Sequence, residues 1–67
     1  MKLFGERLKE LRLEKKLSIE ALAKKVEISK SALSRWELNQ AEPLASSVVV
    51  LAKFFNVSTD YLLGLEN

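Results

Sequence analysis

Three serines limit how this chain can fold, because each stands directly before a segment whose apolar residues have helical spacing. They are Ser18, Ser29 and Ser58. Serine is favoured at a helix N-cap, where its hydroxyl accepts a hydrogen bond from the backbone of the first turn. The sequence has no stretch of alternating β-branched residues that would indicate a strand. These signals predict short helices throughout the chain.

Apolar spacing and stop signals complete the helical pattern. The five predicted helices cover residues 2–16, 19–26, 30–38, 45–55 and 59–63. Phe4, Leu8 and Leu11 form one inward stripe on the first helix, and Leu13 is expected to be exposed. Asn39 suits a left-handed closing position, Pro43 requires a loop, and Gly64 ends the last helix. The fold class is therefore all-α, a compact five-helix bundle.

Composition narrows the possible functions. A chain of 67 residues forms a single domain, here residues 1–67, and it contains no cysteine and no histidine. Disulfides, thiolate metal sites and histidine bases are therefore absent, and we expect neither an enzyme nor a cofactor, metal or small-molecule ligand. No apolar run approaches the roughly 20 residues that span a bilayer. The charged amino end does not resemble a secretory signal, so we expect a cytoplasmic protein with no membrane partner.

Positive charge is concentrated in the first part of the chain. Residues 1–40 contain ten Lys and Arg against six Glu, a difference of +4, whereas residues 41–67 contain one Lys against three acids, a difference of −2. The first part is therefore the part more attractive to a polyanion.

The predicted third helix has two different faces. If Leu33 faces the core, Trp36 and Glu37 lie within about 60° of it, at about 100° per residue. The outward side carries Ser31, Ser34, Arg35 and Leu38, with Lys30 at the amino end. A helix of this kind fits a DNA major groove, where arginine can bind guanine and serine can bind bases or phosphate. An ordinary solvated face is the alternative at this point.

The preceding helix favours the DNA interpretation. Only a tight turn separates residues 19–26 from residues 30–38, and Ala23 allows the two helices to approach closely. Two helices joined in this way form a helix-turn-helix, here about residues 18–38.

The sequence resembles a known family at this point. The segment LEKKLSIEALAKKVEISKSALSRWELNQAEP and the later LAKFFNVSTDYLLG are similar to lambda-type repressors, Cro and their Xre-like bacterial relatives. The resemblance covers nearly the whole chain. It implies a five-helix DNA-binding domain whose third helix enters the major groove, with a homodimer bound to an operator of two half-sites.

The resemblance also implies roles for individual residues. Base-reading and phosphate-reading positions match Lys30, Ser31, Ser34 and Arg35. Positions that contact the DNA backbone match Ser29, Asn39 and Gln40. Arg12 and Glu37 match a structural ion pair between the first and third helices. This chain departs from the family at Ile19, where a glutamine is frequent, at Glu27, where a turn glycine is usual, and at Leu38, where a basic residue is frequent.

The sequence therefore predicts a transcriptional regulator that binds a double-stranded DNA operator, and more specifically a homodimeric repressor associated with the nucleoid. A protein-interaction or antitoxin module on the same scaffold is the alternative. Candidate self-association residues at the carboxyl end are Tyr61, Leu62, Leu63 and Leu65.

Overall fold

The computed structural model describes residues 2–66 and contains five α-helices. They are α1 (Lys2–Glu14), α2 (Ile19–Val26), α3 (Lys30–Glu37), α4 (Ala45–Phe55) and α5 (Thr59–Leu63). No strand occurs within residues 2–66, so the all-α prediction is confirmed. The bounds of α2, α4 and α5 are those predicted, and α3 ends one residue earlier than expected.

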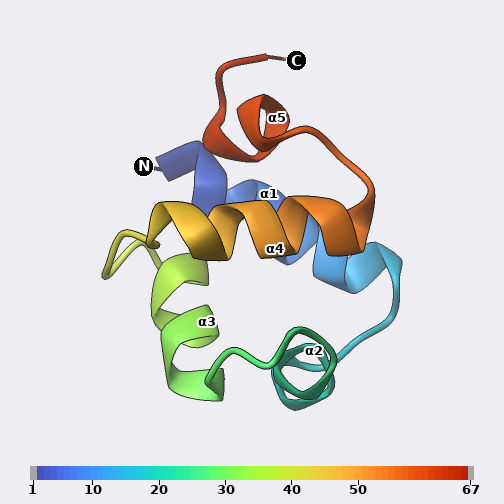
Figure 1. Ribbon diagram of the computed structural model, residues 1–67. Coiled ribbons are helices and arrows are strands. Elements are labelled where there is room, and N and C mark those ends of the chain that lie inside the picture. The colour runs from blue at the N-terminus through green and yellow to red at the C-terminus, as the bar shows by residue number, and fades with distance from the viewer. Residues whose placement is uncertain (1, 67) are drawn as a thin grey trace.

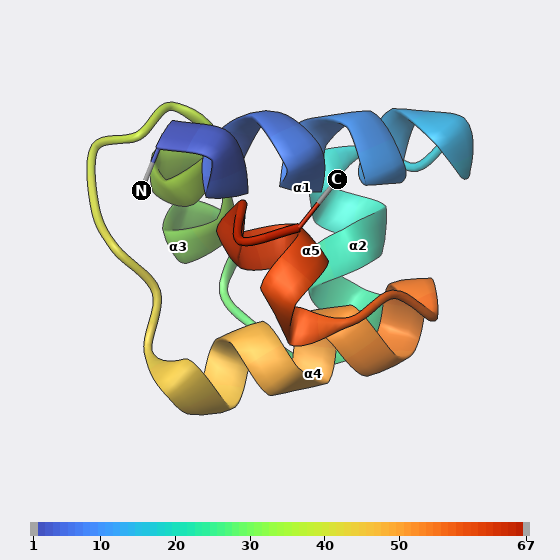
Figure 2. The same cartoon turned by 90° about the horizontal axis from the view of Figure 1, so that it is seen from above.

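The helices pack so that α2 and α3 form one end of the molecule and α5 lies at the other (Figure 1). Seen from above, α1 and α4 run along opposite sides with α5 between them (Figure 2). Helix α1 packs against α3 and α5, whereas α4 packs against α2 and α5. Helix α3 is thus held by α1, and α2 is held by α4.

The three predicted serine caps are present. Ser18 Oγ accepts a hydrogen bond from the Ala21 amide at 3.0 Å, and Ser29 Oγ accepts one from the Ala32 amide at 3.1 Å. Ser58 Oγ likewise accepts from the backbone of Tyr61 at 2.9 Å. Each serine thereby satisfies one of the free amides at the start of a helix, which fixes where α2, α3 and α5 begin.

Each of the five helices is followed by a residue in the left-handed region, and only one of these residues is glycine. They are Lys16, Glu27, Asn39, Asn56 and Gly64, with φ between 57° and 81°. The prediction that the first helix continues to residue 16 was wrong for this reason. Lys16 closes the end of α1 with a hydrogen bond from its amide to the Leu13 carbonyl, so α1 ends at Glu14.

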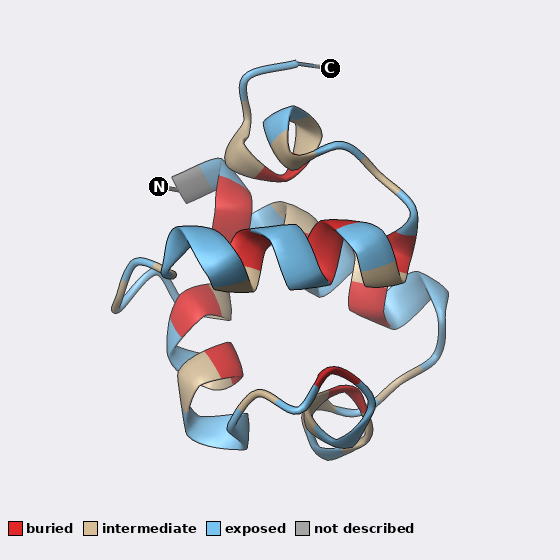
Figure 3. Cartoon of the chain, viewed as in Figure 1, coloured by how far each residue is buried: buried red, intermediate tan, exposed pale blue. Residues whose placement is uncertain are grey.

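The core lies where all five helices meet, and the buried faces point inward (Figure 3). Its fully buried large side chains are Phe4, Leu8, Leu22, Leu33, Leu51 and Leu62. The Phe4 and Trp36 rings pack edge to face with their centroids 6.2 Å apart, which joins α1 to α3. Leu13 is 54% exposed, as its position opposite the inward stripe predicts.

Gly5 is buried at the contact between α1 and the end of α3. A β-carbon placed on Gly5 would lie 2.5 Å from the Trp36 carbonyl oxygen and 2.6 Å from Asn39 Oδ1. Sequence alone assigns this glycine only a cost in helix propensity. In the structure it allows α1 to approach the backbone of α3 more closely than any other residue would.

Candidate nucleic-acid interface

Helices α2 and α3 meet through the turn formed by residues 27–29. In Figure 1, α2 is seen almost end-on while α3 lies in the plane of the picture, so the two helices cross steeply. The turn closes on α2 through the Ile28 amide, which donates to the Ala23 carbonyl at 3.3 Å. This arrangement is a helix-turn-helix.

The inner face of α3 fixes this helix to the domain. Leu33 is fully buried and Trp36 is only 7% exposed. Trp36 therefore serves the core, as predicted, and is not available for stacking on a base.

An ion pair ties α3 to α1. Arg12 Nε donates to Glu37 Oε2 at 2.7 Å and Arg12 Nη2 donates to Glu37 Oε1 at 2.9 Å. Arg12 Nη1 also donates to the Leu17 carbonyl at 2.8 Å, just before the cap of α2. The side-chain hydrogen bond to Glu37 raises the pKa of Arg12; burial opposes this rise, and the charge of Glu37 adds to it. Arg12 thus links α1 to both helices of the motif.

The outward side of α3 carries the residues that the family resemblance assigns to DNA reading. Lys30, Ser31 and Arg35 are exposed, and Ser34 is partly buried. No ion pair or hydrogen bond within residues 2–66 involves the Arg35 side chain, which leaves its five N–H donors free for a ligand. Leu38 continues this face and is 62% exposed.

The residues expected to contact a DNA backbone flank the two ends of α3. Ser29 uses its oxygen to accept the cap hydrogen bond, so its hydroxyl proton is still able to donate to a phosphate. At the other end, Asn39 has φ of 59° and the Gln40 amide donates to the Arg35 carbonyl at 2.8 Å. This closure holds Asn39 and Gln40 on the surface beside the end of the helix.

One feature of the motif was missed by the sequence analysis. Lys30 Nζ lies 2.9 Å from Glu20 Oε1, so the first residue of α3 is paired with a carboxylate from the first turn of α2. By its position in the sequence alone, Glu20 is an acid in the first turn of α2, where the helix dipole favours a negative charge. The spacing rules for pairs within one helix do not extend across a turn, so no simple sequence signal identifies this partner.

Two departures from the family pattern have visible structural effects. Ile19 packs against the core where the family often has a glutamine, so its side chain provides no hydrogen-bond donor. Glu27 occupies the turn position with φ of 57° and is exposed, which places an acid in a conformation that usually favours glycine.

The candidate self-association residues are only partly available. Leu62 is fully buried and its side chain faces the core from α5, so the expectation that it takes part in self-association was wrong. Tyr61 is partly covered by Arg7, whose guanidinium lies 4.2 Å from the centre of the ring. Leu65 is 72% exposed.

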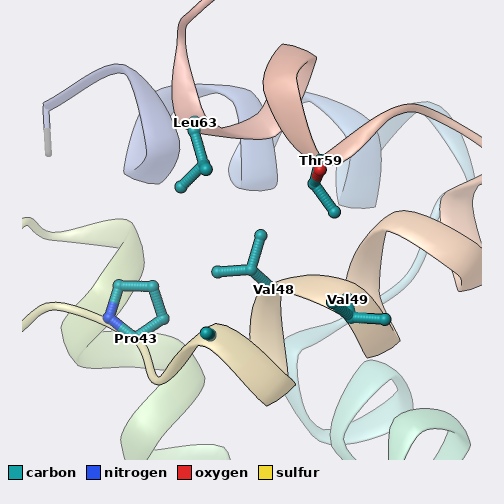
Figure 4. Close-up of a pocket in the computed structure, with 6 residues that line it drawn as sticks. Pro43, Val48, Val49, Thr59 and Leu63 are labelled. Atoms are coloured by element: carbon teal, nitrogen blue, oxygen red, sulfur yellow. The ribbon is translucent and has the colours of Figure 1, made fainter.

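Leu63 lines an apolar pocket between α4, α5 and the loop before α4 (Figure 4). The pocket has a volume of about 390 Å³ and is lined by Pro43, Ala45, Val48, Val49, Thr59 and Leu63. The described part of the chain contains no cluster of acidic residues, histidines or cysteines able to hold a metal ion. None of its helices has both the length and the apolar character needed to cross a membrane.

Comparison with known proteins identifies the class. The family model described as helix-turn-helix matches residues 8–62. The chain therefore belongs to the helix-turn-helix family, in the group of lambda-type repressors and Cro that its motifs resemble.

Relatives include an uncharacterised HTH-type transcriptional regulator of Bacillus subtilis (strain 168), YobD. It is 40% identical over 65 residues, which are 97% of this chain and 58% of YobD. The HTH-type transcriptional activator BcrR of Enterococcus faecalis is 40% identical over 94% of this chain and 31% of its own length. Repressor protein C2 of Salmonella phage P22 is 39% identical over 91% of this chain and 28% of its own length. This chain thus spans less than two thirds of each of these relatives.

A solved structure of a repressor from this group has the same fold as this chain. The P22 c2 repressor protein in complex with synthetic operator 9T, in the presence of Tl⁺, superposes with a TM-score of 0.88 and 36% sequence identity. The match covers 98% of this chain and 100% of that chain.

Proposed function

We propose that this protein is a sequence-specific DNA-binding transcriptional regulator, a repressor that inserts α3 into the major groove of its operator. The observation that carries the proposal is the division of α3 into a buried inner face and an outward face bearing Lys30, Ser31 and Arg35. The similarity to the P22 c2 repressor, whose structure is a complex with a synthetic operator, supports DNA binding by the same fold. The proposed activity is occlusion or positioning at a promoter, without a chemical step.

Each side chain of the outward face suits a different part of this task. Arg35 has an uncommitted guanidinium, whose planar donors match O6 and N7 of guanine. Ser31 and Ser34 are short, so the helix backbone can approach the groove, and their hydroxyls bond to bases or phosphates. Ser29 adds a hydroxyl and the free amides at the start of α3, which favour phosphate. Asn39 and Gln40 extend contact to the backbone beyond the helix end.

The active species in this proposal is a homodimer on two half-sites. Each copy would present one α3, and half-sites one helical turn apart would be read by a two-fold symmetric pair. Tyr61, Leu63 and Leu65 remain the candidate dimer contacts, since they belong to α5 or directly follow it. Helix α5 lies at the end of the molecule away from α2 and α3 (Figure 1). The cytoplasm, where the operator would be located, is the proposed site of action.

A duplex-binding experiment tests this function. The full chain is titrated against a duplex of random sequence over a range of salt concentrations, and selection from a random duplex library then identifies the target. Binding should weaken steeply with salt, because phosphate contacts release counterions. Arg35→Ala should reduce target affinity by roughly 10-fold to 100-fold, the value of one good bidentate base contact. Lys53→Ala, which removes one exposed positive charge from α4, is the matched control and should have little effect.

Failure to bind any duplex at low salt would overturn the proposal. It would favour the alternative, a protein-interaction module, for which the apolar pocket between α4 and α5 is the structural basis. Equal losses for Arg35→Ala and Lys53→Ala would instead exclude α3 as the DNA-reading element.

A further inference from the structure

Glu20 and Lys30 form a contact that the proposed DNA-reading role does not require. Their side-chain atoms Oε1 and Nζ are 2.9 Å apart, and the contact bridges the start of α2 and the start of α3. The two side chains remain 67% and 60% exposed, respectively. A pair this exposed contributes little to folding stability, so the need to fold does not account for it.

The ion pair changes how Lys30 interacts with any DNA. Affinity for duplexes of arbitrary sequence comes from lysines and arginines that neutralise phosphates and release counterions. Lys30 is already neutralised at short range by Glu20. If Lys30 moved to a phosphate, the Glu20 carboxylate would be left unpaired beside the polyanion. Both effects reduce what Lys30 gains from the phosphate backbone alone.

The same pair leaves Lys30 able to recognise a base. An ammonium group has three N–H donors, and Glu20 occupies one of them. The remaining donors are available for acceptors on a base edge, such as O6 and N7 of guanine. The carboxylate also restricts the position of a flexible four-carbon side chain, which reduces the entropy lost when the contact forms.

We infer that Glu20 is a positioning residue that increases DNA sequence specificity by holding Lys30 in an ion pair at the entrance to the groove. The inference rests on the proposed DNA-binding function. Glu20 weakens the attraction between Lys30 and DNA phosphates, because its carboxylate neutralises the ammonium charge. The remaining N–H donors of Lys30 stay available for base edges. Removal of the carboxylate should therefore strengthen binding to random DNA more than binding to the target.

The test compares Glu20→Gln with the unmodified chain on two probes, a random-sequence duplex and the duplex enriched by selection. Affinity for the random duplex should rise roughly fivefold at low salt, and the salt slope should steepen by about 0.9, equivalent to one added phosphate contact. The ratio of target affinity to random affinity should fall by roughly the same fivefold. Glu20→Ala removes the same charge with a residue favoured in helices, and should reproduce the result.

Two matched variants isolate the ion pair. Glu10→Gln makes the same change in net charge at an exposed position of α1, and should alter random-duplex affinity by less than about twofold, because separated surface charges are screened. When Lys30→Met is already present, Glu20→Gln should behave like Glu10→Gln. An effect of Glu20→Gln that equals the control, or that persists without Lys30, would overturn the inference while DNA binding stands. Absence of duplex binding by the unmodified chain would instead reject the proposed function.

Discussion

Gly5 of α1 lies directly against the backbone carbonyl of Trp36 in α3. A β-carbon at position 5 would be 2.5 Å from that oxygen, well inside a van der Waals contact. The obstructing group is backbone at the end of the proposed recognition helix, so it cannot be relieved by a change of rotamer. This contact sets how closely α1 and α3 pack.

Gly5→Ala should therefore destabilise the protein, although the same change inside most helices stabilises by about 1 kcal/mol. We expect a loss of about 1–3 kcal/mol in the free energy of unfolding, as for other overpacked sites, measured by urea denaturation. Glu6→Ala, at the exposed neighbouring position, provides the comparison and should change stability by less. A Gly5→Ala protein more stable than the unmodified chain would contradict the close-packing argument.

Removing one partner of the Arg12–Glu37 ion pair should destabilise the protein more than removing both partners. Arg12→Met leaves the Glu37 carboxylate in a largely buried position, where loss of the partner typically costs about 3–5 kcal/mol. Replacing both residues with methionine should cost less than Arg12→Met alone, because no unpaired charge remains. Urea denaturation of both single variants and the double variant measures the coupling. Additive losses would show that the two side chains act independently.

Arg12 should not make stability depend on pH near neutrality. Its pKa is raised in the folded state, so its contribution is complete below the ordinary arginine pKa and is lost only as pH rises past the folded value. Both the ordinary and the raised pKa of arginine lie far above neutrality. The difference in unfolding free energy between the unmodified chain and the double methionine variant, in which neither charge of the pair is present, should therefore be constant between about pH 6 and pH 9. A change in this difference across that range would contradict the assignment.

Glu27 has two unfavourable effects: its left-handed backbone conformation lowers folding stability, and its negative charge repels phosphate. Two substitutions separate these effects. Glu27→Gly should stabilise the fold by up to about 1 kcal/mol, because glycine accepts the left-handed conformation at φ of 57° without steric penalty. Glu27→Gln keeps the backbone cost and removes only the charge, so stability should change little. Both variants should bind random duplex more tightly than the unmodified chain, if the turn lies near phosphate. Unfolding experiments and duplex titrations on the same samples distinguish the two contributions.

Leu38 offers a place to add a phosphate contact. It is 62% exposed at the end of the outward face of α3, and Leu38→Lys should steepen the salt dependence of duplex binding by about 0.9. Leu13→Lys adds the same charge at an exposed leucine of α1 and should leave the slope nearly unchanged. Equal slopes for the two variants would place Leu38 outside the DNA contact.

Self-association can be tested through Leu65, which is 72% exposed. If the carboxyl end forms the dimer contact, Leu65→Glu should shift the protein toward monomer in sedimentation equilibrium without altering its unfolding transition in dilute solution. Leu13→Glu supplies a matched control on α1 and should leave the association state unchanged. Retention of the dimer by Leu65→Glu would remove this residue from the proposed interface.

Features determined by neighbouring residues were predictable from the sequence, whereas features determined across the fold were not. Ser18, Ser29 and Ser58 mark helix starts because a cap bonds within three residues of itself. The helix at residues 45–55 was likewise predictable from the spacing of its apolar residues, although its sequence is rich in valine. The role of Gly5 depends on a carbonyl in another helix, and the partner of Lys30 lies across a turn. No local propensity contains that information.

The anchoring of α3 has a consequence for how such a protein changes its target during evolution. Leu33, Trp36 and Glu37 hold the helix from its inner side, whereas the side chains of Ser31 and Arg35 are exposed on its outer side. Substitutions at the two exposed positions should therefore change folding stability little, whereas substitutions at the inner positions would destabilise the fold and be removed by selection. Under the proposed function, a lineage could therefore move to a new operator through these two codons alone, and the same scaffold could be retargeted in the laboratory without redesign of its core.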